Sequence, residues 1–103
     1  MSIMDREDLR KALEQAKEMQ IDLVKVQAEL ANTEINGISA NAKVMISMTA
    51  QGEFHAVKID PTLLAEGLSS VETSLLQALK NVSEKAADLT KSRLSQISKS
   101  IGL

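Results

Sequence analysis

The sequence predicts an α+β fold, in which a helix, a three-stranded antiparallel sheet and a second, long helix follow one another in a single domain. Apolar residues recur at helical spacing up to residue 31, alternate with a period of two between residues 33 and 60, and return to helical spacing from residue 70. A chain of 103 residues is most simply one domain, over residues 1–103, that buries only about two-thirds of its unfolded surface. Its core is small, and a partner chain would enlarge it.

The first predicted helix covers residues 5–31. Its apolar residues alternate spacings of three and four without a break, which is the pattern of an amphipathic helix with a seam of the coiled-coil type. The seam consists of Leu9, Ala12, Ala16, Met19, Leu23, Val26 and Leu30. We interpret it as a packing face and not as a ligand groove, because such stripes usually face a protein core.

The next segment is predicted to form three short strands joined by tight connections, an antiparallel meander. The strands cover residues 33–39, 42–50 and 53–60. One face of the second strand carries Val44, Ile46 and Met48. In the third strand Val57 and Ile59 share a face, but Phe54 is out of phase with them. Either a bulge near His55 and Ala56 restores the phase, or Phe54 covers the end of the sheet from the turn.

The chain turns at Asp60-Pro61 and, after a loop, enters a second predicted helix over residues 70–100. Ser69, followed three residues later by Glu72, matches the capping box that marks a helix start. The first apolar stripe of this helix consists of Leu75, Leu79, Val82, Ala86 and Leu89. One step around the helix lies a second stripe, made of Leu94, Ile97 and Ile101. The two halves of the helix are therefore expected to pack on different surfaces.

The predicted helices are much longer than the predicted strands. A helix of about 28 residues is roughly 42 Å long, whereas a strand of about six or seven residues spans only about 20–23 Å. The sheet cannot cover either helix, so roughly half of each apolar stripe needs another partner. A second copy of the chain is the simplest supplier, and we expect a homodimer whose helices project beyond a small central sheet.

Few residues are available for catalysis or metal binding. The chain has no cysteine and a single histidine, His55, so thiol chemistry, zinc–thiolate sites and histidine-rich metal sites are excluded. His55 falls in a strand pattern, and Asp60 precedes a proline, where aspartate commonly forms turns. The four glycines are scattered and form no phosphate-binding loop. We expect no enzyme and no bound metal or cofactor.

Charge is unevenly distributed along the chain. The net charge of −2 argues against a nucleic-acid partner, but the segment after Leu89 carries cations and no anion. These cations are Lys91, Arg93 and Lys99. A second group near the N-terminus, interspersed with carboxylates, consists of Arg6, Arg10, Lys11 and Lys17. An aromatic content of 1% leaves too few rings to stack the bases of single strands.

The N-terminal sequence MSIMDREDLRK carries charge of both signs and no apolar core of signal-peptide length. Nowhere do about 18 apolar residues run together, which is the length that a membrane span needs. Together with the absence of cysteine, these features favour a cytoplasmic location.

Three stretches match a known family: QAKEMQ in the first helix, VMISM in the second strand and VKIDPTLL ahead of the second helix. Over nearly its whole length the chain resembles the YbaB/EbfC family of bacterial nucleoid-associated proteins. The signature V-x-I-D-P-x-L-L corresponds to Val57, Ile59, Asp60, Pro61, Leu63 and Leu64. The resemblance implies a helix, sheet and helix fold, a dimer shaped like tweezers, binding of double-stranded DNA, and a role in nucleoid organisation and gene regulation.

The chain departs from the family pattern in its loops. Members often carry several glycines between the first helix and the second strand, where this chain has only Gly37. They often carry another in the next turn region, where it has Thr49-Ala50, and the glycine- and proline-containing tail is shortened to SIGL. These differences concern loop geometry and not the fold.

Two functions remain open from the sequence. In the first, helix ends of a dimer straddle a duplex and contact its phosphates, largely without regard to base sequence. The candidate contacts are Lys91, Arg93, Lys99, Arg6, Arg10 and Lys11, although each could equally belong to a solvated helix face. In the alternative, a dimeric adaptor docks a partner protein on the stripe at Leu94, Ile97 and Ile101, and DNA association is weak or indirect. The same stripe is also a candidate dimer seam.

Overall fold

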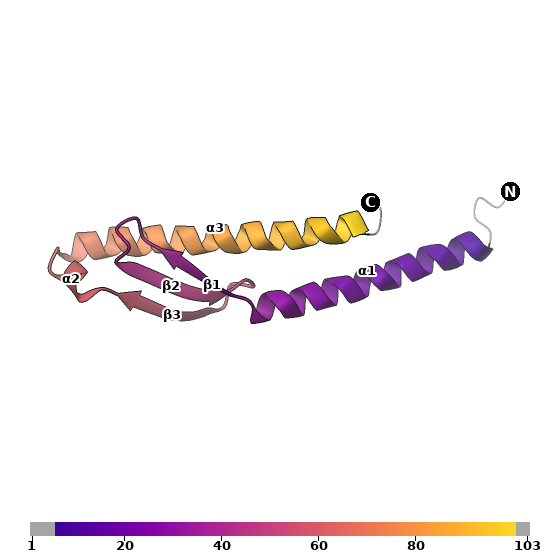
Figure 1. The fold of residues 1–103 in the computed structure, drawn as a ribbon, viewed down its shortest axis with the longest axis horizontal. Coiled ribbons are helices and arrows are strands. Elements are labelled where there is room, and N and C mark those ends of the chain that lie inside the picture. Colours follow the sequence, from indigo (N-terminus) through magenta and orange to yellow (C-terminus); the bar gives the residue numbers. More distant parts are fainter. Residues whose placement is uncertain (1–5, 101–103) are drawn as a thin grey trace.

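The computed structural model describes residues 6–100, and its element order confirms the predicted α+β fold (Figure 1). The elements are α1 (Arg6–Asn32), β1 (Glu34–Ile38), β2 (Val44–Thr49), β3 (Phe54–Ile59), α2 (Pro61–Leu64) and α3 (Leu68–Ser100). The strands form one antiparallel sheet in the order β1-β2-β3. Predicted and observed ends of the strands and long helices differ by one or two residues. Asp5, the predicted first residue of α1, lies outside the described residues.

The molecule is far more elongated than a compact domain. Its extents are 76 × 21 × 17 Å and its Cα radius of gyration is 21.0 Å, whereas a compact domain of this length has a radius of about 13 Å. Figure 1 shows the cause: the first half of α3 lies along the sheet, while its second half and α1 extend beyond the same end of the sheet. The predicted projection of the helices is confirmed.

The core lies between α3 and one face of the sheet. Its largest fully buried side chains are Val44 and Ile46 of β2, Leu63 of α2 and Val82 of α3. Strand β1 approaches α3 most closely at Gly37, where no side chain stands between strand and helix. A Cβ at Gly37 would lie 2.6 Å from the carbonyl oxygen of Ala78 and closer still to the Cβ of Val82. Gly37 therefore sets the distance between strand and helix.

A bulge in β3 resolves the phase of Phe54. Ser47 pairs with Ala56, but the next residue of β2, Met48, pairs with Phe54, so that His55 is the extra residue. Of the two alternatives that the sequence leaves open, the bulge is confirmed. It places Phe54 on the same face of the sheet as Val57, which is the face that α3 covers over β1 and β2.

Side chains of α3 cover the outer edge of β1. Asn81 Oδ1 accepts a hydrogen bond from the backbone N–H of Ile38 (3.0 Å), and Gln77 Oε1 accepts one from that of Ala40 (3.1 Å). Lys85 Nζ donates to a backbone carbonyl of the same strand (2.9 Å). The three side chains are spaced four residues apart and so lie on one side of α3. They satisfy backbone groups that would otherwise be open to another strand.

The segment between the sheet and α3 corrects one prediction. Helix α3 begins at Leu68, so Ser69 lies inside its first turn and is not the cap. Gly67, with φ +103, makes the turn into the helix in a backbone conformation that favours glycine. The predicted loop also contains the short helix α2, whose N-cap is Asp60.

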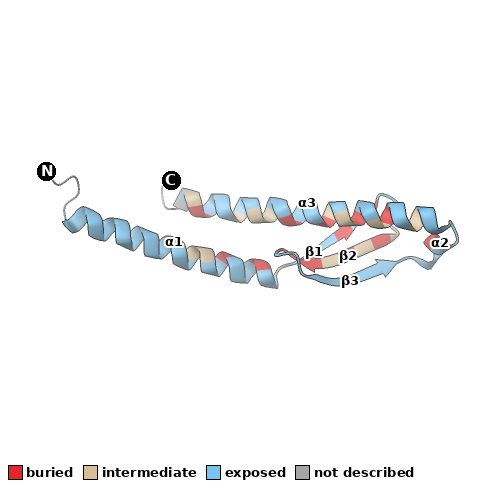
Figure 2. Cartoon of the chain, turned by 180° about the vertical axis from the view of Figure 1, so that it is seen from behind, coloured by how far each residue is buried: buried red, intermediate tan, exposed pale blue. Residues whose placement is uncertain are grey.

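Strand β3 is the uncovered side of the sheet (Figure 2). All of its residues are exposed, including the inward-facing Phe54, Val57 and Ile59, at 56%, 53% and 37%. Among the strands, helix α3 packs mainly on β1 and β2. The N-terminal half of α1 is likewise exposed, including Leu9 and Leu13 of its apolar residues.

Candidate nucleic-acid interface on the projecting helices

Two helical segments extend beyond the sheet, and we call them the arms: residues 6–29 of α1 and residues 89–100 of α3. Figure 1 shows that they run in opposite chain directions on the same side of the sheet and lie next to each other at its end. All six cations predicted to contact DNA lie on the arms. The candidate nucleic-acid interface therefore lies on the arms.

The three cations of α3 do not share one face. Lys91 and Lys99 are exposed and, at eight residues apart, lie about 80° apart around the helix. Arg93 lies about 160° from Lys91, on the side that turns toward α1. It is half-buried and forms an ion pair with Glu29 of α1. Only Lys91 and Lys99 point outward in the way that the sequence-based hypothesis requires.

The candidate cations of α1 lie in its first two turns and are exposed. Arg6 and Arg10 are one turn apart and share a face, whereas Lys11 lies about 100° further around the helix than Arg10. Lys17 falls on the Arg6 side, within about 20°. Lys17 is not among the candidate contacts predicted from the sequence, although its spacings of seven residues from Arg10 and eleven from Arg6 indicate the shared face.

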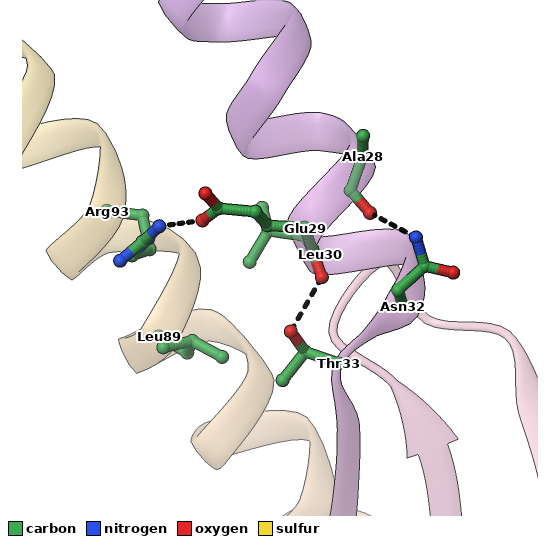
Figure 3. A pocket seen from close by; sticks show the side chains of 7 residues that line it. All are labelled: Ala28, Glu29, Leu30, Asn32, Thr33, Leu89 and Arg93. Carbon is green, nitrogen blue, oxygen red and sulfur yellow. Dashed lines mark hydrogen bonds and ion pairs between the residues drawn. The ribbon is translucent and has the colours of Figure 1, made fainter.

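The arms meet in a groove where α1 enters β1 (Figure 3). Its lining residues are Ala28, Glu29, Leu30, Asn32, Thr33, Leu89 and Arg93. The end of α1 is fixed there by its own side chains: Thr33 Oγ1 donates to the carbonyl of Glu29 (2.6 Å) and Asn32 Nδ2 to that of Ala28 (3.0 Å). These bonds occupy carbonyl groups that a helix end leaves unpaired. The side chain of Glu29 therefore extends toward Arg93 from a helix end that Thr33 holds by a hydrogen bond.

The second apolar stripe of α3 is divided between two environments. Ile97 is buried and lines, with Val26, the contact between α3 and α1. Leu94 is 44% exposed and lines a separate groove with Met48 and Ala87. Ile101 lies outside the described residues. The expectation that the halves of the helix pack on different surfaces is confirmed, but a docking stripe or dimer seam that includes Ile97 is wrong, because α1 of the same chain covers that residue.

Asp60 serves as a turn and helix-cap residue, as its place before proline predicts. Its carboxylate accepts hydrogen bonds from the backbone N–H (2.9 Å) and the hydroxyl (2.8 Å) of Thr62. The backbone bond, then the hydroxyl bond, and to a smaller extent the charge of Lys43, lower the pKa of Asp60 from 3.8. Within residues 6–100, no three histidine, cysteine or acidic residues are grouped to hold a metal ion. Across the same part of the chain, no helix has the length and apolarity of a membrane span.

The geometry defines a small α+β protein with two projecting helices, each of which carries exposed cations. The chain belongs to the YbaB/EbfC DNA-binding family, whose model matches residues 4–101. It is 38% identical over 79 residues to a nucleoid-associated protein of Neisseria meningitidis serogroup C, covering 74% of this chain and 71% of that one. It is 30% identical over 100 residues to a nucleoid-associated protein of Corynebacterium glutamicum, covering 96% and 97%.

A solved structure shares the fold. The crystal structure of an uncharacterized protein from Helicobacter pylori superposes with a TM-score of 0.73 at 21% sequence identity, covering 91% of this chain and 97% of that one. At this identity the likeness concerns the fold alone. The likeness covers the helix, the three-stranded sheet and the long helix of this chain.

Proposed function

We propose that this protein is a nucleoid-associated homodimer that binds double-stranded DNA through its arms, largely without regard to base sequence. The observation that carries the proposal is the placement of exposed cations on the arms of a chain from a DNA-binding family. The outward-facing ones are Arg6, Arg10, Lys11, Lys17, Lys91 and Lys99. Arg93 is the remaining candidate, and it reaches a phosphate only after leaving Glu29.

The proposed homodimer rests on apolar surface that this chain leaves open. Phe54, Val57 and Ile59 continue the core face of the sheet but receive no cover from α3. Exposed apolar side chains gathered on one face indicate an interaction surface. A second copy brings the same face and the same uncovered α1, so a symmetric pair would bury both.

The charge of the chain supports duplex binding in which the long-range attraction is weak and the affinity is sensitive to salt. Two chains of net charge −2 give an acidic dimer, so affinity comes from local contacts and not from overall attraction. Lysine and arginine side chains on a helix surface release counterions from the phosphates that they contact. Such contacts carry no base readout. DNA bound in this way would alter the conformation of the nucleoid, and with it gene expression.

The test is a titration of fluorescent duplexes of unrelated sequence with the purified protein, at several salt concentrations between about 50 and 200 mM. We expect equal affinities for the different duplexes, weaker binding of a single strand of the same length, and a steep loss of affinity as salt rises. Absence of binding at the lowest salt would contradict the proposal. Association only in the presence of a co-purified protein would support the adaptor alternative instead.

A further inference from the structure

Arg93 differs from the other cations of α3 because its charge is already engaged. It pairs with the Glu29 carboxylate across the groove between the arms (Figure 3), and the two side chains are 35% and 52% exposed. Lys91 and Lys99 are exposed, and Lys91 lines the separate groove at Leu94. Arg93 is thus close to a duplex bound along the arms, yet it has an intramolecular partner.

The ion pair between Arg93 and Glu29 is of a kind whose members change partners readily. Water screens an ion pair whose members are this exposed, so the pair adds little stability. A DNA phosphate offers the arginine fork a bidentate, charge-assisted partner of the same geometry as the carboxylate. After an exchange, Glu29 would still have a cation within reach, because Lys25 lies one turn before it and lines a second groove with Glu29 and Arg93.

We propose that Glu29 is a built-in competitor of DNA: on duplex binding Arg93 leaves Glu29 for a phosphate, and Glu29 thereby lowers the affinity of the protein. The inference rests on the proposed function. Thr33 holds the backbone of Glu29 at the end of α1, so the carboxylate stays at the base of the arms and competes in every encounter. As a consequence of this competition, Glu29 lowers the affinity for the duplex, and Arg93 contributes to the salt dependence of binding.

The experiment is a double-mutant cycle of Glu29→Gln and Arg93→Gln, with duplex affinity measured at several salt concentrations. Glu29→Gln is expected to tighten binding about two- to fivefold, the strength of an exposed ion pair, without changing the slope of log affinity against log salt. Arg93→Gln is expected to reduce that slope by about 0.9 for each protomer that contacts the duplex. In the Arg93→Gln background, Glu29→Gln should have almost no effect on affinity.

Asp22→Asn is the matched control, because Asp22 lies two turns before Glu29 on the same face of α1 and lines the same groove as Arg93. It also removes one negative charge, and its effect should be the same with and without Arg93. Equal tightening by Glu29→Gln in both Arg93 backgrounds would mean general charge repulsion and would overturn the inference. So would an Arg93→Gln variant whose salt slope equals that of the wild type, although duplex binding itself would then stand. A wild type that binds no duplex would overturn the proposed function as well.

Discussion

The two outer strands of the sheet differ in how the chain completes them. Strand β1 is covered on its inner face by α3, which approaches over Gly37, and its edge is closed by Gln77, Asn81 and Lys85. Strand β3 continues the same apolar face but is exposed along its whole length. One side of the sheet is therefore covered by the chain itself, and the other is the side that the proposed dimer would cover.

The largest effect, on the affinity of the proposed dimer, is expected from Val57→Asp, which places a charge on the uncovered face of β3. In the proposed dimer this change leaves an unpaired charge in a buried interface, which costs about 3–5 kcal/mol. The dimer dissociation constant should rise more than about 100-fold, while the circular dichroism spectrum of the monomer stays unchanged because Val57 is exposed in the single chain. Sedimentation equilibrium measures both mass and affinity.

Ala56→Asp is the matched control for this change. It places the same charge next in sequence to Val57, and its register partner Ser47 lies on the opposite face from the buried Ile46. We expect the mass of this variant to equal that of the wild type. If Val57→Asp leaves the mass at that of a dimer, or if both variants dissociate equally, the inner face of β3 is not the interface.

The next largest effect comes from the covered side, through Gly37→Ala. The added methyl group would lie 2.6 Å from the carbonyl oxygen of Ala78, so β1 has to move away from α3. Overpacking of this kind typically lowers the free energy of unfolding by about 1–3 kcal/mol. Urea denaturation measures it, with Ala56→Val as the control, because that site on β3 is exposed. A Gly37→Ala variant as stable as the wild type would contradict the close approach.

A smaller loss is expected when the cover of the β1 edge is removed by Asn81→Ala. The N–H of Ile38 then loses its acceptor, which costs about 1 kcal/mol, and the edge becomes available to another strand. The midpoint of thermal unfolding and the rate of aggregation at high concentration measure the two consequences. Lys80→Ala, at the neighbouring exposed position of α3, should change neither; equal behaviour of the two variants would contradict the edge-covering role.

The smallest effect on stability is expected from loss of the charge of Asp60, the N-cap residue between β3 and α2. Because the folded state lowers the pKa of Asp60 from 3.8, its contribution to stability is present above that pH and is lost as the pH falls through the lowered value. The melting temperature of the wild type should therefore exceed that of Asp60→Ala by a constant amount above about pH 5, and the gap should narrow in stronger acid. A gap that does not change with pH would show that the charge of Asp60 plays no part.

Periodic patterns were sufficient to predict the long elements, and they left the bulge in β3 as one of two alternatives. A period of two over β2 fixed its buried face, and the phase of Phe54 against Val57 signalled the extra residue in β3. The start of α3 was predicted wrongly, because Gly67 and the four-residue helix α2 redirect the chain before the capping-box sequence. Asp60-Pro61 and Gly67 are the local signals for this helix and turn, and the capping-box match at Ser69 was preferred to them.

The candidate contacts with DNA stay a prediction, and the structure adds the position of each cation on the arms. The clustering of charge selected these cations, yet the pairing of Arg93 with Glu29 joins residues that only the fold brings together. The helical repeat does separate Arg93 from Lys91, since two residues correspond to about 200° around the axis. What it cannot give is the identity of the partner on α1.

The most direct test of the account compares charges on the arms with charges at the sheet end. Lys91→Gln/Lys99→Gln and Lys58→Gln/Lys80→Gln each remove two exposed lysines per chain, so the net charge changes equally. We predict that the arm variant lowers the slope of log affinity against log salt for a duplex by about 0.9 for each lost contact, and that the sheet-end variant keeps the wild-type slope. Equal slopes for both variants, or a loss confined to the sheet-end variant, would contradict binding through the arms.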